Sequence, residues 1–77
     1  MKKFENYARV TVDGYTLAFK KWEKYGKSRI YINEVKGQDG QREVSTGAYI
    51  ENGELQRSTG YEIFKNVVKE FFATYEI

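Results

Sequence analysis

The stretch STGYEIFKNVVKEFFATY, residues 58–75, decides the fold because its apolar residues recur with the period of an α-helix. On a helical projection its charged residues occupy one half of the cylinder. The other half holds the apolar and aromatic residues Tyr61, Ile63, Phe64, Val67, Val68, Phe71, Phe72 and Tyr75. Ser58 or Thr59 is a suitable N-cap, and Glu62 follows Thr59 with the spacing of a capping box. The pattern predicts a C-terminal helix over about residues 60–75.

The residues before this helix alternate between apolar and polar side chains, as β-strands do. Strands are expected at residues 6–12, 15–25, 29–35 and 42–51, with a short fifth strand or a connector at 54–57. Asp13-Gly14 and Asn52-Gly53 are typical two-residue hairpin turns. Lys20-Lys21-Trp22 interrupts the alternation, so we expect a β-bulge or a change of twist near there. The order predicts an α+β fold, in which an antiparallel β-meander is followed by one amphipathic helix packed on one sheet face.

The composition excludes several classes of site. The chain has 77 residues, enough for a single domain over residues 1–77, and it contains no Cys, His or Pro. Disulfides, thiol nucleophiles and zinc sites built on Cys or His are therefore excluded. The acidic residues stand at turns and strand ends, where acids are common anyway. We expect no enzyme, no catalytic residue, no metal and no cofactor.

The longest apolar run, Phe71-Phe72-Ala73, is too short for a membrane span or a signal peptide. The absence of Cys fits a reducing compartment. A cytoplasmic protein without membrane contact is expected.

The apolar half of the helix is wider than one sheet face needs. It spans about 180°, whereas an ordinary surface helix has an apolar stripe somewhat over 100° wide. The uncovered part would be exposed in a monomer, and such patches usually mark an interface. We expect a homodimer with the interface residues Phe64, Val68, Phe71, Phe72 and Tyr75. The alternative is a strongly curved sheet that wraps the whole stripe.

Charge is distributed unevenly along the chain. Residues 1–42 have a net charge of +5, and residues 43–77 have a net charge of −3. A basic first half favours an anionic partner. The alternative is that lysines on strand edges prevent aggregation.

The strand pattern also predicts what each sheet face carries. The helix is expected to cover Val10, Leu17, Phe19, Ile30, Ile32, Val44 and Ile50. The opposite face then carries Arg9, Lys20, Trp22, Arg29, Tyr31, Asn33, Ser45 and Tyr49. Single-stranded nucleic acid suits such a surface, because phosphates bind Lys or Arg and unstacked bases bind flat aromatic rings. The alternative is purely structural, since these residues form strands well and pack across strands as Tyr–Arg pairs.

The stretch GKSRIYINEV, residues 26–35, is a Gly-Lys turn followed by an alternating strand, and QDGQ at residues 38–41 is an acidic-Gly loop. With the order of four strands and a C-terminal helix, these features resemble the positive cofactor four family of transcriptional coactivators. The resemblance implies a dimer formed through the helix and single-stranded DNA bound on the curved sheet. Lys27, Arg29 and Tyr31 are the matching positions. The chain departs from the family pattern at residues 42–50, which contain no Pro and one basic residue.

These observations predict a small protein that binds single-stranded DNA or RNA, with an accessory role in transcription or replication. Phosphate contacts are expected from Arg9, Lys20, Lys27, Arg29 and Arg42. Base stacking is expected on Trp22, Tyr31 and Tyr49. The alternative is a small accessory or inhibitory protein of a phage or mobile element. It would contact a protein partner through Phe64, Phe71 and Phe72, or through an edge strand.

Overall fold

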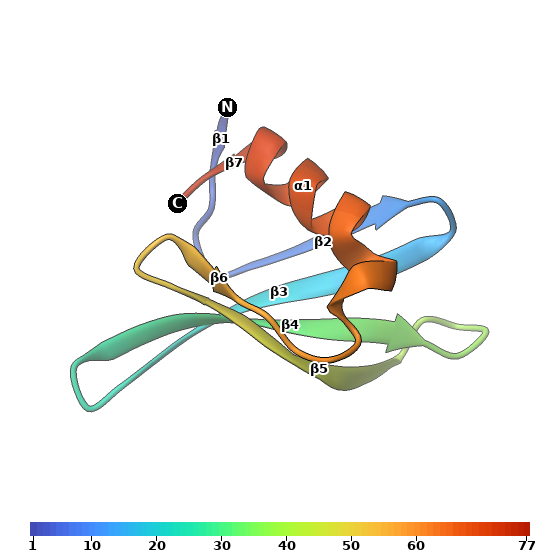
Figure 1. The fold of residues 1–77 in the computed structure, drawn as a ribbon, viewed down its shortest axis with the longest axis horizontal. Helices are drawn as coiled ribbons and strands as arrows, with labels where there is room; N and C mark the ends of the chain where they lie inside the picture. Colours follow the sequence, from blue (N-terminus) through green and yellow to red (C-terminus); the bar gives the residue numbers. More distant parts are fainter.

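Five antiparallel strands form a meander in which each strand pairs with the next one along the chain (Figure 1). The computed structural model describes all residues 1–77. The strands are β2 (Tyr7–Val12), β3 (Tyr15–Lys24), β4 (Lys27–Lys36), β5 (Arg42–Glu51) and β6 (Glu54–Gln56). A 3-10 helix, η1 (Tyr61–Phe64), leads into α1 (Lys65–Thr74), which lies on one face of the sheet. The predicted α+β class and the meander are confirmed.

Three of the strand connections are two-residue turns with nearly the same backbone. Their central pairs are Asp13-Gly14, Tyr25-Gly26 and Asn52-Gly53, and all six residues have positive φ. Positive φ at both central residues defines the type I′ turn, which matches the twist of a hairpin. The second turn lies one residue earlier than the sequence pattern suggested. Strand β4 therefore begins at Lys27 rather than at residue 29.

The expected bulge at Lys20-Lys21-Trp22 is wrong, because β3 and β4 pair in regular register from Leu17–Glu34 to Lys24–Lys27. Lys21 breaks the alternation for another reason. It lies on the helix side of the sheet and lines a hollow of about 220 Å³ with Phe4 and Ile77. There its ammonium pairs with Glu23. The break in the alternation therefore comes from a charged residue on the helix side of a regular strand, and not from a bulge.

The actual irregularity is in β5. Tyr49 pairs with Tyr31 and Ser45 pairs with Asn33, so residues 46–48 oppose Ile32 alone. The Thr46 hydroxyl donates to the Ile32 carbonyl at 2.6 Å and accepts from the Ala48 N–H at 3.1 Å. Because the strand gains two residues, the alternation of faces is preserved and Ala48 still points into the core.

The core lies between α1 and the sheet, with Phe71 at its centre. Phe71 is fully buried and stacks on Phe19, with ring centroids 3.9 Å apart and an interplanar angle of 7°. Phe4 meets the same ring edge-on at 5.3 Å. The buried cluster consists of Phe4, Ala8, Leu17, Phe19, Ile30, Ile32, Ala48, Ile50, Phe64, Val67, Val68 and Phe71.

The N-terminal segment covers the helix where the sheet does not. Strand β1 (Lys2–Lys3) pairs in parallel with β7 (Tyr75–Glu76), and the Phe4 N–H donates to the Glu76 carbonyl at 2.9 Å. Both chain ends therefore lie side by side (Figure 1). Residues 2–4, called the N-terminal strap below, place Phe4 against the rings of Phe71 and Tyr75.

This cover closes most of the apolar helix surface that predicted a dimer. Of the five residues expected at an interface, Phe64, Val68 and Phe71 are buried within the single chain, while Phe72 and Tyr75 are half-buried. The three buried residues cannot form an exposed interface. Among the apolar residues of the predicted stripe, only Ile63 remains largely exposed, at 61%. The dimer itself stays a prediction, without the open apolar surface that suggested it.

The predicted capping box does not form. The first turn is a 3-10 turn that follows Gly60, and no side chain caps it. The Ser58 carbonyl accepts from the Tyr61 N–H at 3.1 Å, whereas the Ser58 hydroxyl is buried without a hydrogen bond. Ser58 packs instead against the irregularity in β5. A Cβ atom added at Gly47 would lie 3.3 Å from the Cβ atom of Ser58.

None of the helices has the length and apolar character that a membrane crossing requires.

We predict that Phe4→Ala lowers the free energy of unfolding by about 3 kcal/mol, because it removes a buried aromatic ring and leaves a cavity beside Phe71. Urea denaturation followed by circular dichroism measures the change. Ile63→Ala is the matched control, since its exposed side chain should change stability by less than about 0.5 kcal/mol. Equal losses in the two variants would show that the strap is not part of the core.

Candidate nucleic-acid interface

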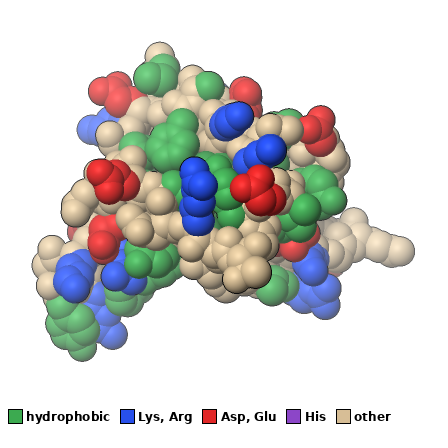
Figure 2. All heavy atoms as spheres, viewed as in Figure 1, with side chains coloured by type: hydrophobic (Ala, Val, Ile, Leu, Met, Phe, Trp, Pro, Cys, Tyr) green, Lys and Arg blue, Asp and Glu red, His purple; other side chains and the backbone are tan.

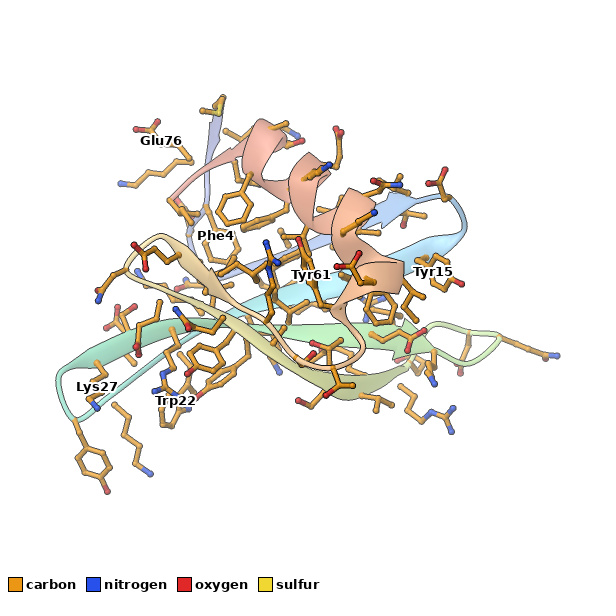
Figure 3. All side chains as sticks on the ribbon, viewed as in Figure 1. Phe4, Tyr15, Trp22, Lys27, Tyr61 and Glu76 are labelled. Carbon is orange, nitrogen blue, oxygen red and sulfur yellow. The ribbon has the colours of Figure 1, made fainter.

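The strand register places the expected polar and aromatic residues on the sheet face opposite the helix, called the outer face below. Lys20, Tyr31 and Tyr49 form one cross-strand row. Trp22, Arg29 and Glu51 form the next row, toward the β3–β4 turn. Figure 3 shows Trp22 and Lys27 on the side of the sheet away from α1. The alternation in the sequence thus assigned these residues to the correct face.

Three aromatic rings lie next to one another across β3, β4 and β5. The centroids of Trp22 and Tyr31 are 5.8 Å apart, and those of Tyr31 and Tyr49 are 6.0 Å apart. The interplanar angles are 64° and 54°, so the rings pack at a tilt and do not stack in parallel. Trp22 is 45% exposed, and the two tyrosines are half-buried. This aromatic row leaves ring surface open on the outer face.

Arg29 is fixed at one end of the aromatic row. Its guanidinium carbon lies 4.3 Å from the centroid of the Tyr49 ring, and its Nε donates to Glu51 Oε2 at 2.7 Å. The hydrogen bond to Glu51 raises the pKa of Arg29, which therefore stays charged at any relevant pH. Because Glu51 neutralises part of this charge, Arg29 is a weaker phosphate contact than the sequence suggested. Its planar group instead adds a stacking surface beside Tyr49.

Arg9 is committed to a second polar cluster on the outer face. Its Nε donates to the Tyr7 hydroxyl at 2.7 Å, and the Tyr7 hydroxyl donates to Glu43 Oε2 at 2.7 Å. Arg9 Nη2 also lies 3.2 Å from the same carboxylate oxygen. Residues Tyr7, Arg9 and Glu43 are called the polar bridge below. It joins β2 to β5 although two strands lie between them, because Ala18 in the middle is small and fully buried.

The polar bridge shifts the titration of its members. The hydrogen bond from Tyr7 lowers the pKa of Glu43, and bonds from Asn33 and Arg9 act in the same direction. Burial and the bond to Glu43 raise the pKa of Tyr7. The cluster therefore holds an ionised carboxylate at neutral pH. Arg9 faces that carboxylate and does not offer a free charge to a phosphate.

The unpaired cations of the outer face are lysines near the β3–β4 turn. Lys20, Lys24 and Lys27 form no hydrogen bond or ion pair with another side chain, and Lys24 and Lys27 are cross-strand partners. Figure 2 shows basic and hydrophobic side chains gathered at the tip of this hairpin. Lys24 is not among the residues expected at the site, although its position two residues after Trp22 puts both on one face.

Arg42 lies apart from the other expected residues. It pairs with Lys36, at the opposite end of β4 from Lys27. Its neighbour Glu43 faces the outer side, so Arg42 faces the other side of the sheet. The structure therefore brings together Lys20, Trp22, Lys27, Arg29, Tyr31 and Tyr49, and it separates Arg42 from them.

The surface that the alternative interpretation needs is largely internal. Phe64 and Phe71 are buried, and only Phe72 of the three phenylalanines expected to contact a protein partner is half-buried.

No protein-family model, curated protein or solved structure matches this chain. The resemblance to the positive cofactor four family accordingly stays a prediction, and the function is argued from the site.

We predict that Glu43→Gln lowers the free energy of unfolding at neutral pH by about 1 kcal/mol, because it removes the charge that Tyr7 and Arg9 stabilise. The folded-state pKa of Glu43 lies below its ordinary value of 4.5. Its contribution is therefore complete above pH 4.5 and disappears as the pH falls through the lowered value.

Urea denaturation of the parent and the variant at neutral and acidic pH measures this contribution. The two should differ at neutral pH and converge in acid. Glu5→Gln, which changes an exposed carboxylate without an ion pair, should match the parent at both pH values. A difference that persists unchanged into acid would show that the ionised form of Glu43 does not stabilise the fold.

Proposed function

We propose that this protein binds single-stranded nucleic acid on the outer face of its sheet. The observation that carries the proposal is the aromatic row of Trp22, Tyr31 and Tyr49, which lies beside three lysines without ion pairs. Bases stack on the aromatic rings and on the guanidinium plane of Arg29. Phosphates contact Lys20, Lys24 and Lys27. The combination of aromatic platforms with cations is typical of surfaces that bind single strands without strong sequence preference.

The charge of the site supports an anionic ligand. Both carboxylates nearest the outer rows already have basic partners, since Glu43 pairs with Arg9 and Glu51 pairs with Arg29. The three lysines are therefore a local surplus of positive charge. Three phosphate contacts on a single strand predict that log K falls with log salt concentration with a slope of roughly −2.

The geometry favours a single strand over a duplex. A duplex hides its base faces, so it gains little from exposed aromatic rings and keeps only the phosphate contacts. The aromatic row has the size to stack about two or three bases, as aromatic rings on other antiparallel sheets do. Lys27, Arg29 and Tyr31, the positions that the resemblance to the positive cofactor four family singles out, are alternate residues of β4 on this face.

We expect a single-stranded oligonucleotide to quench the fluorescence of Trp22, the only tryptophan, and a matching duplex to quench it less. Tyr31→Ala should weaken single-strand binding at least about five-fold, because it removes the central stacking ring. The control is Tyr15→Leu, which changes a half-exposed tyrosine packed against Phe64 under the helix. Unchanged affinity in a folded Tyr31→Ala variant would rule out base stacking on this row.

A pair of charge reversals tests the position of the site. Lys27→Glu should weaken binding and make the salt dependence shallower, because one phosphate contact is replaced by repulsion. Arg42→Glu changes the net charge equally at the far end of β4 and should have a much smaller effect. Equal losses would indicate only a general attraction between net charge and nucleic acid. No binding by the parent protein, even at low salt, would move the argument to a protein partner.

A further inference from the structure

The turn between β3 and β4 contains a residue that its backbone disfavours. Asp13, Tyr25 and Asn52 occupy the same position in the three type I′ turns, with φ of 54°, 54° and 53°. Asp and Asn tolerate this left-handed conformation well, whereas a bulky side chain there is a conformational outlier. Tyr25 is also 89% exposed, so burial of its ring does not offset the strain.

The same turn carries a second unfavourable choice. Lys24 and Lys27 are direct cross-strand partners, and like charges in such positions repel each other. Glu51 and Glu54 close the β5–β6 turn in the same way, but Arg29 pairs with Glu51 and relieves that repulsion. No carboxylate pairs with Lys24 or Lys27. The β3–β4 turn thus combines strain with uncompensated positive charge.

The turn is continuous with the aromatic row. The Lys24 ammonium lies 5.1 Å from the centroid of the Tyr25 ring and 5.6 Å from the centroid of the Trp22 ring. Lys24 therefore stands between the tip and the row. The β3–β4 hairpin extends away from the helix-covered core (Figure 1, Figure 3), and residues 24–27 at its tip are exposed.

We propose that Tyr25 is a fourth base-stacking aromatic ring, which extends the nucleic-acid site from Trp22 to the tip of the β3–β4 hairpin. A single strand offsets both unfavourable features, because its phosphates neutralise the charges of Lys24 and Lys27 and a base stacked on the Tyr25 ring compensates for the backbone strain. Strained backbone positions cluster at functional sites. The inference rests on the proposed function and specifies how far that site extends.

The decisive variant is Tyr25→Asn, because stability and binding should change in opposite directions. Asn fits the turn better, so the midpoint of thermal unfolding should rise. Affinity for an oligothymidylate of about twelve nucleotides should fall about five-fold or more, measured by the anisotropy of a labelled oligonucleotide. Tyr25→Phe keeps the ring and should match the parent in affinity. Asp13→Tyr places the same side chain in the β2–β3 turn, at the other end of β3, and should lower the midpoint without weakening binding.

The outcomes separate this inference from the proposed function. If the parent binds and Tyr25→Asn binds equally well, Tyr25 is not a contact and the site ends at Trp22. If Tyr25→Asn is no more stable than the parent, the argument from strain is wrong. If the parent binds no oligonucleotide at low salt, the proposed function fails and the inference falls with it. Higher stability together with lower affinity is the result that supports the inference.

Discussion

The contact between Phe71 and Phe19 organises the rest of the molecule. These parallel rings join the only α-helix to the second strand of the meander, so one sheet face is committed to the core. A short helix cannot also protect its own outer flank, and Phe4 supplies that cover from the other end of the chain. Because all three elements converge on Phe71, the opposite sheet face takes no part in the core and can carry polar and aromatic chemistry.

The outer face has two parts with different physical characters. At the start of β2, the charged groups of the polar bridge pair with one another and cover Ala18. Toward the β3–β4 turn, aromatic rings are partly exposed and lysines lack partners. The first part resists a ligand, because any phosphate would have to compete with Glu43 for Arg9. The second part leaves cations and ring surface open, and the proposed binding of single strands rests on these features.

Local patterns in the sequence predicted the features that depend on neighbours along the chain. Alternation assigned Trp22, Tyr31 and Tyr49 to one face, and helical periodicity identified the buried side of α1. The errors arose where distant segments meet. Nothing near Arg9 indicates that Glu43, 34 residues later, neutralises it. Residues 2–4 have no strand pattern of their own, so the sequence does not predict the cover over Phe71, and the apolar stripe of the helix predicts a second copy instead. Lys21 breaks the alternation because its position on the helix side of the sheet lies beside the chain ends, where a charged side chain is tolerated, and the sequence alone reads this break as a bulge.

The pairing of β1 with β7 has a consequence for how the fold opens and closes. Each hairpin of the meander joins neighbouring segments, whereas this pairing must close a loop that contains nearly the whole chain. It is short and parallel, and it lies at the termini, where native-state opening is most frequent. Fraying of the two chain ends therefore precedes global unfolding. In that opened state the edge of Phe71 and the ring of Tyr75 meet water, which makes the frayed form the most self-associating species of a chain whose closed form keeps these rings covered.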